Sequence, residues 1–202
     1  MQRYLSLPAV ALAAVVVLSG CGSTGSRPSA DSQSASSARE VSASHNEADV
    51  MFAQMMIPHH QQAVEMSDML LAKKGISPEV IDLATSIREA QAPEMDTMAG
   101  WLKEWDEPAE LADGMEGHHM GAIDGTGGML SEEEMADLEA AQGDEAARTF
   151  LKYMTAHHIG AVDMAREEIK KGENAEAVAL AEAIAETQKA EVQEMKDLLA
   201  GL

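Results

Sequence analysis

The sequence predicts an all-α fold, a four-helix bundle made of two related helical hairpins, and three observations lead to it. Beyond residue 45, Ala, Glu, Met, Leu and Gln dominate, runs of β-branched residues are absent, and only 3% of the whole chain is aromatic. Apolar residues recur there at spacings of three and four, which is the period of an α-helix. Two segments also repeat each other, so each half can supply one hairpin that buries its apolar face on the other.

The repeat is clearest in two stretches that each hold a pair of adjacent histidines. Phe52–Met66 reads FAQMMIPHHQQAVEM, and Phe150–Met164, 98 positions later, reads FLKYMTAHHIGAVDM. A second match, at an offset of 97, relates Gln91–Leu102 (QAPEMDTMAGWL) to the segment that begins at Gln188. We therefore expect a pseudo-twofold axis between the two halves. The expected layout is a hairpin at 45–105, a linker at 106–143 and a hairpin at 144–202.

The first 44 residues are predicted to direct export. Residues 1–20 combine a basic residue with an apolar run, Ala9–Leu18, which is too short for an anchored spanning helix and predicts a signal peptide. The run ends in Leu-Ser-Gly-Cys, similar to the lipobox of bacterial lipoproteins, which predicts lipidation of Cys21 and attachment to a bacterial membrane outside the cytoplasm. Cys21 is the only cysteine, so no intrachain disulfide can form. Residues 21–44, rich in Ser and Ala, are predicted to be a flexible tether, and 45–202 to fold as one domain.

Capping residues set the expected helix boundaries in the first hairpin. The first helix should run from about 46 to 73 and end before Gly75. Ser77 is placed as an N-cap with Pro78 at the first helical position, opening a second helix that continues to about residue 105. Two prolines inside these helices are expected to bend them, Pro58 and Pro93.

The linker is expected to contain a long loop and one short helix. Residues 106–130 are rich in Gly, Pro, Asp and Met, which indicates a crossover loop. Ser131 with Glu134 three residues later forms a capping box that begins a short helix to about residue 140. The remaining helices are expected at 144–171, ended by Gly172, and at 174–200.

The repeated histidine pairs predict a metal site inside the bundle. On a helix, residues three, four and seven apart share a face, so Met56, His59 and Met66 form one stripe, and the second copy repeats it. A Gln-x-x-Glu in the second helix of each hairpin adds a carboxylate. Imidazole and thioether together suit copper, Cu(I) above all, and Cu(II) as well. The candidate ligands in the helices are Met56, His59, His60, Met66, Glu94, Met154, His157, His158, Met164 and Glu191.

A third histidine pair lies in the predicted loop, within MEGHHMG. His118, His119 and Met120 stand in a glycine-bearing segment that has no core to fill, so packing explains them poorly. We interpret them as candidate ligands for copper acquisition.

A purely structural reading of the helical histidines stays open. Methionine at helical spacing is more often a core side chain than a ligand. One histidine of each pair could face inward and bind Glu94 or Glu191, as a polar network that specifies the bundle without any metal.

The charge of the chain limits its partners. It has 14 Lys and Arg against 35 Asp and Glu, a formal net charge of -21. So acidic a protein is not expected to bind nucleic acid or anionic lipid head groups, but it would attract cations. The membrane is therefore expected to be a partner only through the lipid anchor.

Taken together, four motifs resemble one family, catalogued as domain of unknown function 305. They are the MIPHHxxAxxM of the first stripe, its second copy, the GMLSEEEM at Gly128–Met135 and the QxxExMxxWL at Gln91–Leu102. The resemblance spans His45–Leu202 and implies a ferritin-like four-helix bundle, secreted or lipid-anchored, with copper binding in some members. This chain departs from its own repeat where Ala156 replaces Pro58, which suggests that the two sites differ in affinity.

Three functions remain in competition at this point. The first is a non-enzymatic, lipid-anchored protein that sequesters copper or transfers it to a receiving protein. The second is a ferritin-like di-iron or di-manganese oxidase, which would need Glu-x-x-His motifs that the two halves do not share. The third is an acidic bundle that binds a protein partner and keeps its histidines for structure. Self-association of the bundle is open in each case.

Overall fold

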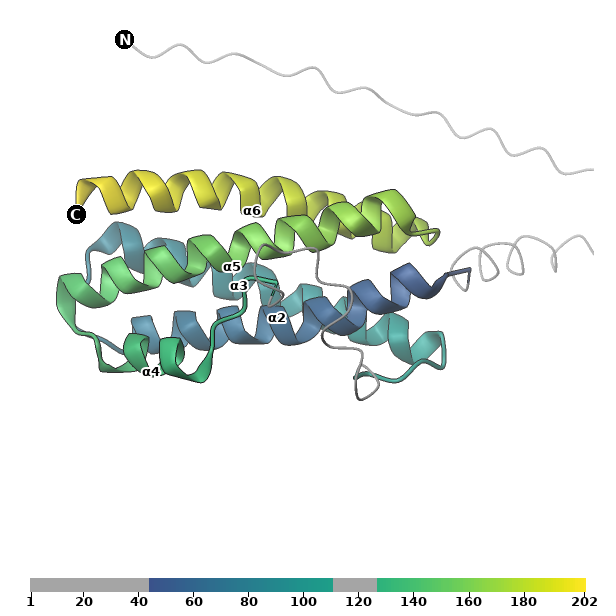
Figure 1. Cartoon of the computed structure of the whole chain (residues 1–202), viewed down its shortest axis with the longest axis horizontal. Helices are drawn as coiled ribbons and strands as arrows, with labels where there is room; N and C mark the ends of the chain where they lie inside the picture. Colours follow the sequence, from purple (N-terminus) through teal and green to yellow (C-terminus); the bar gives the residue numbers. More distant parts are fainter. Residues whose placement is uncertain (1–43, 111–126) are drawn as a thin grey trace, which may run out of the picture.

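The computed structural model describes residues 44–110 and 127–202, and within them helices joined by turns and loops are the regular structure, without strands (Figure 1). The all-α expectation is confirmed. The helices are α2 (Glu47–Leu71), α3 (Pro78–Glu104), α4 (Glu132–Ala140), α5 (Gly143–Lys171) and α6 (Ala175–Gly201).

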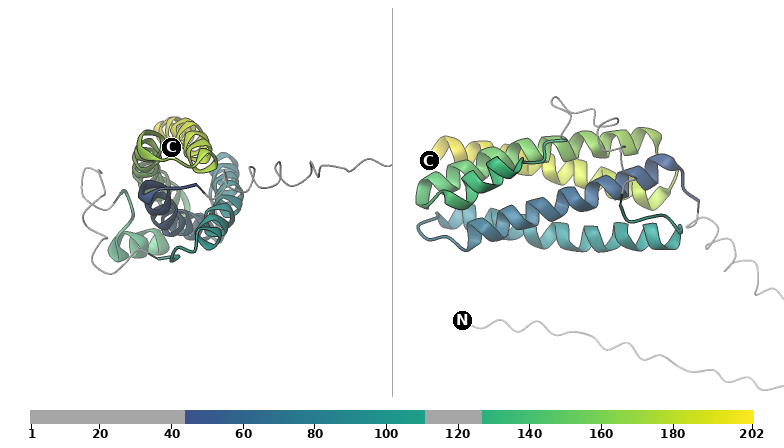
Figure 2. Two further views of the ribbon diagram at one scale, coloured as in Figure 1. Left: turned by 90° about the vertical axis from the view of Figure 1, so that its right-hand side faces the viewer. Right: turned by 60° about the horizontal axis from the view of Figure 1, so that its bottom comes forward.

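Four long helices form the bundle, in two hairpins. Helices α2 and α3 pair as the first hairpin and α5 and α6 as the second, and α2 packs on α5 to join them. The short α4 lies outside the bundle, against α2 and α5 (Figure 2). The predicted arrangement of two duplicated hairpins is therefore the observed one.

The helix ends agree with the sequence to within one or two residues, the usual uncertainty of such boundaries. Pro58 and Pro93 both lie inside helices, as predicted. The capping box of Ser131 and Glu134 is present. One detail differs, because Ser77 stands at the N-cap of α3 but its side chain makes no capping hydrogen bond. The Pro78 ring at the first helical position supplies the local start instead.

Two apolar clusters fill the bundle, and a layer of histidines separates them. The α4-side cluster includes Leu70, Phe150 and Leu138, and the tryptophan-side cluster includes Phe52 and Trp101. Along α2, the residues before the His-His pair belong to the tryptophan-side cluster and those after it to the α4-side cluster. The polar layer thus crosses the core near the middle of the helices. The histidine layer consists of His59, His60, His157 and His158, all fully buried.

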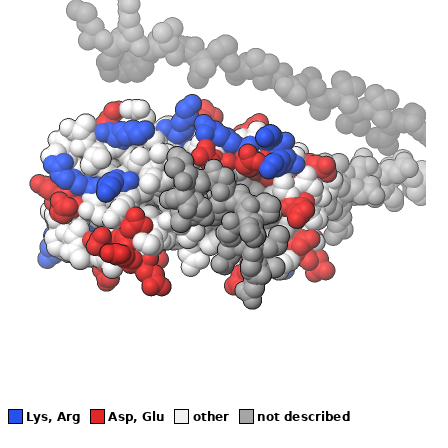
Figure 3. All heavy atoms as spheres, in the orientation of Figure 1, with Lys and Arg blue, Asp and Glu red and all other residues white. Residues whose placement is uncertain are grey.

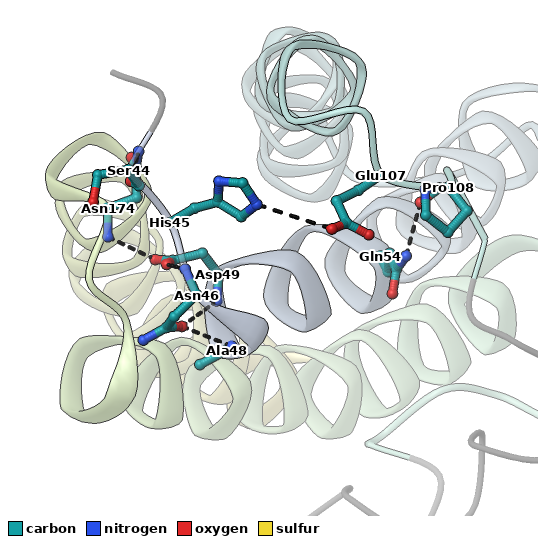
Figure 4. Close-up of polar contacts among 9 residues, drawn as sticks. All are labelled: Ser44, His45, Asn46, Ala48, Asp49, Gln54, Glu107, Pro108 and Asn174. Atoms are coloured by element: carbon teal, nitrogen blue, oxygen red, sulfur yellow. Dashed lines mark hydrogen bonds and ion pairs between the residues drawn. The ribbon is translucent and has the colours of Figure 1, made fainter. Parts of the chain in front are cut away.

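The start of α2 is fastened to the turn between α5 and α6 (Figure 4). Asn46 caps α2, its side chain accepting hydrogen bonds from the backbone of Ala48 and Asp49. The fully buried Asp49 carboxylate accepts from the backbone N–H groups of Glu173 and Asn174, at 3.2 and 3.0 Å. These bonds hold the two hairpins together at one end of the bundle.

Several predictions fall outside the described residues. The signal peptide, the tether and Cys21 lie before residue 44, and His118, His119 and Met120 lie in the segment 111–126. Within the described helices, none is long and apolar enough to cross a membrane.

Candidate metal centre

The histidine layer brings the two halves of the duplication into direct contact. His59 comes from α2 and His157 from α5, and both side chains are fully buried. Their rings lie 3.6 Å apart between centroids, tilted by 34°. The sequence stripes around these two residues therefore do converge, across the predicted pseudo-twofold axis.

The second histidine of each pair is bound by a glutamate from the neighbouring helix. His60 Nε2 lies 2.7 Å from Glu94 Oε2, and His158 Nε2 lies 2.9 Å from Glu191 Oε2. An ionised carboxylate can only accept, so Nε2 carries a proton in each pair. In the neutral form of the ring, Nδ1 then keeps a free electron pair. This is the arrangement in which a carboxylate fixes the tautomer and orientation of a metal-binding histidine.

His59 is oriented by the backbone of the segment that precedes α4. Its Nε2 lies 3.0 Å from the carbonyl oxygen of Gly127, which again requires the proton on Nε2 and leaves Nδ1 free to accept. Gln62 holds the same segment, donating to the carbonyl of Leu130 at 2.9 Å and accepting from its N–H at 2.7 Å. The Gly127 carbonyl can approach α5 this closely because Gly160 has no side chain. A Cβ at Gly160 would overlap that carbonyl group.

Burial keeps the central histidines uncharged. It lowers the pKa of His59 to about 3, and lowers the pKa of His157 well below its ordinary value, with the neighbouring His59 adding to the effect. Both rings are therefore neutral at physiological pH. A neutral imidazole is the form that binds a metal ion.

As a purely structural network, the histidine layer leaves several buried polar atoms without hydrogen bonds. Five buried ring nitrogens in it have no hydrogen-bond partner, namely Nδ1 of all four histidines and Nε2 of His157. The carboxamide oxygens of Gln91 and Gln188, three residues before the two glutamates, are also buried and unpartnered. Native interiors leave few such atoms, and each costs roughly 1–3 kcal/mol. The unused electron pairs therefore represent capacity for a ligand.

The predicted thioether ligands flank this layer on both sides. Met56 belongs to the tryptophan-side cluster, and Met164 packs against it. Met66 and Met154 belong to the α4-side cluster. Met56, Met66 and Met154 are fully buried and serve the core, whereas Met164 is only partly buried. Each predicted stripe therefore runs past the histidines from one apolar cluster to the other.

The layer lacks a carboxylate-rich cage. In residues 44–110 and 127–202, no group of three or more His, Cys, Asp or Glu side chains is placed to hold a metal ion. The rings of His59 and His157 face each other with their planes tilted by 34°. Rotation about χ2, a soft torsion, would let imidazole nitrogens and a neighbouring thioether share an ion. Such a set of few, soft ligands suits Cu(I).

Two contributors to the layer were not predicted from the sequence. Gly127, the backbone partner of His59, and Gln62, which holds the segment after it, are separated from their partners by 68 positions. In the sequence, the GMLSEEEM motif that begins one residue after Gly127 indicates a family pattern and a helix start, but not a contact with His59. Its glycines were the available signal, since Gly127 and Gly128 both have positive φ angles, of 64° and 81°.

Comparisons with known proteins give consistent matches. The family model described as domain of unknown function (DUF305) matches residues 49–199. A DUF305 protein from Streptomyces coelicolor is 35% identical, over 76% of this chain and 91% of that chain, with a TM-score of 0.66. A DUF305 fragment from Deinococcus radiodurans is 31% identical, over 78% and 98%, with a TM-score of 0.67. No curated protein matches the chain.

A further similar structure contains a metal. CopM in its Cu(I)-bound form is 31% identical to this chain, over 76% of this chain and 96% of that chain, with a TM-score of 0.61. CopM has also been solved in Cu(II)-bound and silver-bound forms.

Proposed function

Because the chain belongs to the DUF305 family, we propose that it is a copper-binding protein that sequesters or transfers the ion outside the cytoplasm. The observation that carries this proposal is the histidine layer, with five unpartnered ring nitrogens in the middle of an otherwise apolar core. The copper-bound and silver-bound forms of CopM, a similar structure, support copper as the bound ion.

Within the layer, we assign the ion to the histidines and their neighbouring thioethers. His59 and His157 are the central ligands, since they are the closest pair across the two halves. His60 and His158 join them through Nδ1, with Glu94 and Glu191 as the carboxylates that orient them rather than as direct ligands. The available methionine ligands are the fully buried ones, Met56, Met66 and Met154.

The soft ligand set favours Cu(I), and the imidazoles would accept Cu(II) as well. Thioether and imidazole ligands suit a protein in an oxidising compartment, because cysteine thiolates would be lost to disulfides there. The function requires no reaction step, so we place the chain among carriers rather than enzymes. A di-metal oxidase finds no support in the described residues, where Glu94 and Glu191 are each committed to a histidine.

The N-terminal segment supplies the proposed location. A signal peptide at 1–20 with lipidation at Cys21 would tether the bundle to a membrane through residues 21–44. Mass spectrometry of the membrane fraction tests this part separately. A mature chain that begins at residue 21 and carries a diacylglyceryl-sized addition is the expected product, and an unmodified Cys21 would contradict the anchor.

The proposal as a whole is tested by a competition titration of the full chain with Cu(I) under anaerobic conditions, with Cu(II), Zn(II) and Fe(II) in parallel. We expect tight Cu(I) binding that falls at least about tenfold in a His59→Gln/His157→Gln variant, as expected when primary ligands are lost. Glutamine retains a polar side chain of similar length, which limits the damage to the core. The matched control is His45→Gln, a histidine outside the layer that contacts Trp105.

Each result has a clear meaning. Unchanged copper affinity in the double variant, with a lower melting temperature, would show that the histidines are structural and would overturn the proposal. Binding of Fe(II) alone, with consumption of oxygen, would replace it with the oxidase.

A further inference from the structure

A surface pocket of about 500 Å³ lies between α2 and α5, beside the histidine layer. Three methionines line it, Met51 and Met55 from α2 and Met164 from α5. Gly127 also lines this pocket, and its carbonyl oxygen is the hydrogen-bond acceptor of His59 Nε2. One backbone group therefore separates the pocket from the buried histidines.

Packing alone explains two of these methionines poorly, because Met51 and Met55 belong to neither apolar cluster, whereas Met164 also packs against the tryptophan-side cluster. The methionines of the core are fully buried, whereas Met51, Met55 and Met164 are partly exposed and face a cavity. Met51 and Met55 are four residues apart, so they lie on the same face of α2. Their thioethers are thus presented together to the pocket instead of filling a gap in the core.

The charged residues around the pocket are largely paired with one another. Arg166 binds Asp163 at 2.9 Å, and Lys171 binds Glu167 at 2.6 Å. Among the described residues that line the pocket, the donors left for a ligand are therefore the thioethers and the carboxyl group of Glu168, whose buried oxygens have no hydrogen-bond partner. Of these, the thioethers are the soft donors. Glu47 adds a carboxylate at the rim, which favours a cation as the occupant.

The internal duplication provides a comparison within the same molecule. Glu47, Met51 and Met55 correspond, at the offset of 98, to residues 145, 149 and 153. A second surface depression is lined by those residues, Glu145, Thr149 and Tyr153. The fold therefore accepts a threonine and a tyrosine at these places, so the pair of methionines is not required for a hairpin of this kind to form. The pair of methionines at these places is therefore a feature of α2 that α5 does not repeat.

We propose that this pocket is a second, outer metal site, which binds a soft monovalent cation such as Cu(I) or Ag(I) through the thioethers of Met51, Met55 and Met164. Neutral sulfur ligands select this class of ion against Zn(II), Mg(II) and Ca(II). The site deepens the proposed copper function, because an ion held there lies next to the Gly127–His59 contact that borders the buried layer. Binding in the pocket itself does not depend on the histidines.

The test is a titration of the full chain with Ag(I), which has no redox chemistry under these conditions, followed by native mass spectrometry and X-ray absorption at the silver edge. The variant Met51→Leu/Met55→Leu/Met164→Leu removes the sulfur atoms and nearly preserves volume. The control variant, Met69→Leu/Met95→Leu/Met135→Leu, removes the same number of methionines away from the pocket. We expect the pocket variant to lose one silver equivalent and its sulfur-only coordination, and the control to lose neither.

A second variant guards against a packing artefact. Met51→Thr/Met55→Tyr installs the residues that the other half already carries, and it should lose the same equivalent while remaining folded by circular dichroism. If both pocket variants bind as many ions as the wild type, with the same sulfur coordination, the outer site is overturned.

The His59→Gln/His157→Gln variant separates this proposal from the proposed function. It should keep the sulfur-bound silver and lose the nitrogen-bound ion. If only the pocket variants lose the sulfur-bound ion, the outer site is supported, whatever the histidine variant does. If the histidine variant binds as many ions as the wild type, the buried site is overturned.

Discussion

Glu94 and Glu191 act on the histidine layer through charge as well as position. Each accepts a hydrogen bond from an Nε2 atom of a fully buried histidine, while its own side chain remains partly exposed to solvent. A negative carboxylate raises the basicity of the opposite nitrogen, Nδ1, and so strengthens it as a ligand. The same contact would also stabilise a layer without metal, so a variant must separate the two roles.

Glu94→Gln and Glu191→Gln provide that separation. Glutamine can still accept the hydrogen bond, but it removes the negative charge. We therefore predict that each variant weakens Cu(I) affinity by about tenfold, the smaller end of the effect when a residue that orients a metal-binding histidine is changed. The measurement is a competition titration against a chelator of known affinity. Glu186→Gln, an exposed residue of α6, is the control. Equal affinities in all variants would mean that the glutamates have only a structural role.

The position of the Gly127–Leu130 segment against α5 depends on a single residue, Gly160. A Cβ at this position would overlap the Gly127 carbonyl, so Gly160→Ala must displace the backbone that His59 contacts. We predict a loss of about 1–3 kcal/mol in the free energy of unfolding, the range for overpacked sites. Gly100→Ala is the matched control, because nothing lies within 4 Å of its added Cβ.

The control should move in the opposite direction. Gly100 lies inside α3, where alanine is favoured over glycine by roughly 0.5–1 kcal/mol. Denaturant unfolding of both variants measures the two effects. A Gly160→Ala protein as stable as the wild type would show that stability does not depend on the close approach of the Gly127 carbonyl to residue 160.

At the scale of the helices, the contact between α2 and the end of α5 is sensitive to pH. Glu168 of α5 is 2% exposed, and burial together with the neighbouring Asp49 raises its pKa from an ordinary value of 4.5 to about 8. At a pH between these two pKa values, Glu168 has lost its proton in the unfolded chain and keeps it in the folded chain. Stability from this group is therefore complete below pH 4.5 and decreases as the pH rises towards about 8.

Glu168→Gln removes this dependence. Glutamine resembles the protonated acid, so we predict little change in melting temperature at acidic pH and a rise of a few degrees at mildly alkaline pH, where about 1 kcal/mol corresponds to ~2–4 °C in a domain of this size. Thermal unfolding across the pH range checks it, with the exposed Glu182→Gln of α6 as the control. A variant that is less stable than the wild type at alkaline pH would contradict the raised pKa.

The elements themselves could be predicted from the sequence because their signals are local. Helix starts depend on neighbours, such as the capping pair Ser131 and Glu134, and the duplication revealed which helices correspond. Long-range contacts carried no comparable signal. Asp49 binds backbone groups 124 and 125 positions away, and nothing near it in the sequence indicates this. His59 and His157 could be paired only because the repeat relates them.

The surroundings of the methionines also could not be predicted from local sequence signals. Period and spacing place a methionine on a helix face, but they do not distinguish a residue inside a closed core from one that lines a cavity. Met56 was predicted as a ligand and is fully buried in the core, whereas Met51, one helical turn before Met55, was not singled out and lines the pocket. The difference depends on how α5 and Gly127 close over α2, which is decided by tertiary packing.

At the scale of the whole molecule, the net charge of -21 opposes compaction. Acidic side chains gather over α4, with basic residues along another part of the same face (Figure 3). The ion pairs of the described surface, such as Arg88 with Asp68, neutralise only a small part of this excess. Repulsion among the remaining carboxylates is long-ranged at low ionic strength and is screened over about 10 Å at 0.1 M salt.

We therefore predict that sodium chloride raises the melting temperature of the protein between low and physiological ionic strength, even though it weakens the surface ion pairs, whose individual contributions are about 0–1 kcal/mol. A variant with Glu182, Glu186 and Glu194 of α6 changed to glutamine carries three fewer of these exposed charges and should show a shallower salt dependence. Thermal unfolding of both proteins in a salt series measures the slopes. A melting temperature that falls with salt would mean that attraction between paired charges, rather than the excess of carboxylates, dominates the electrostatics of the bundle.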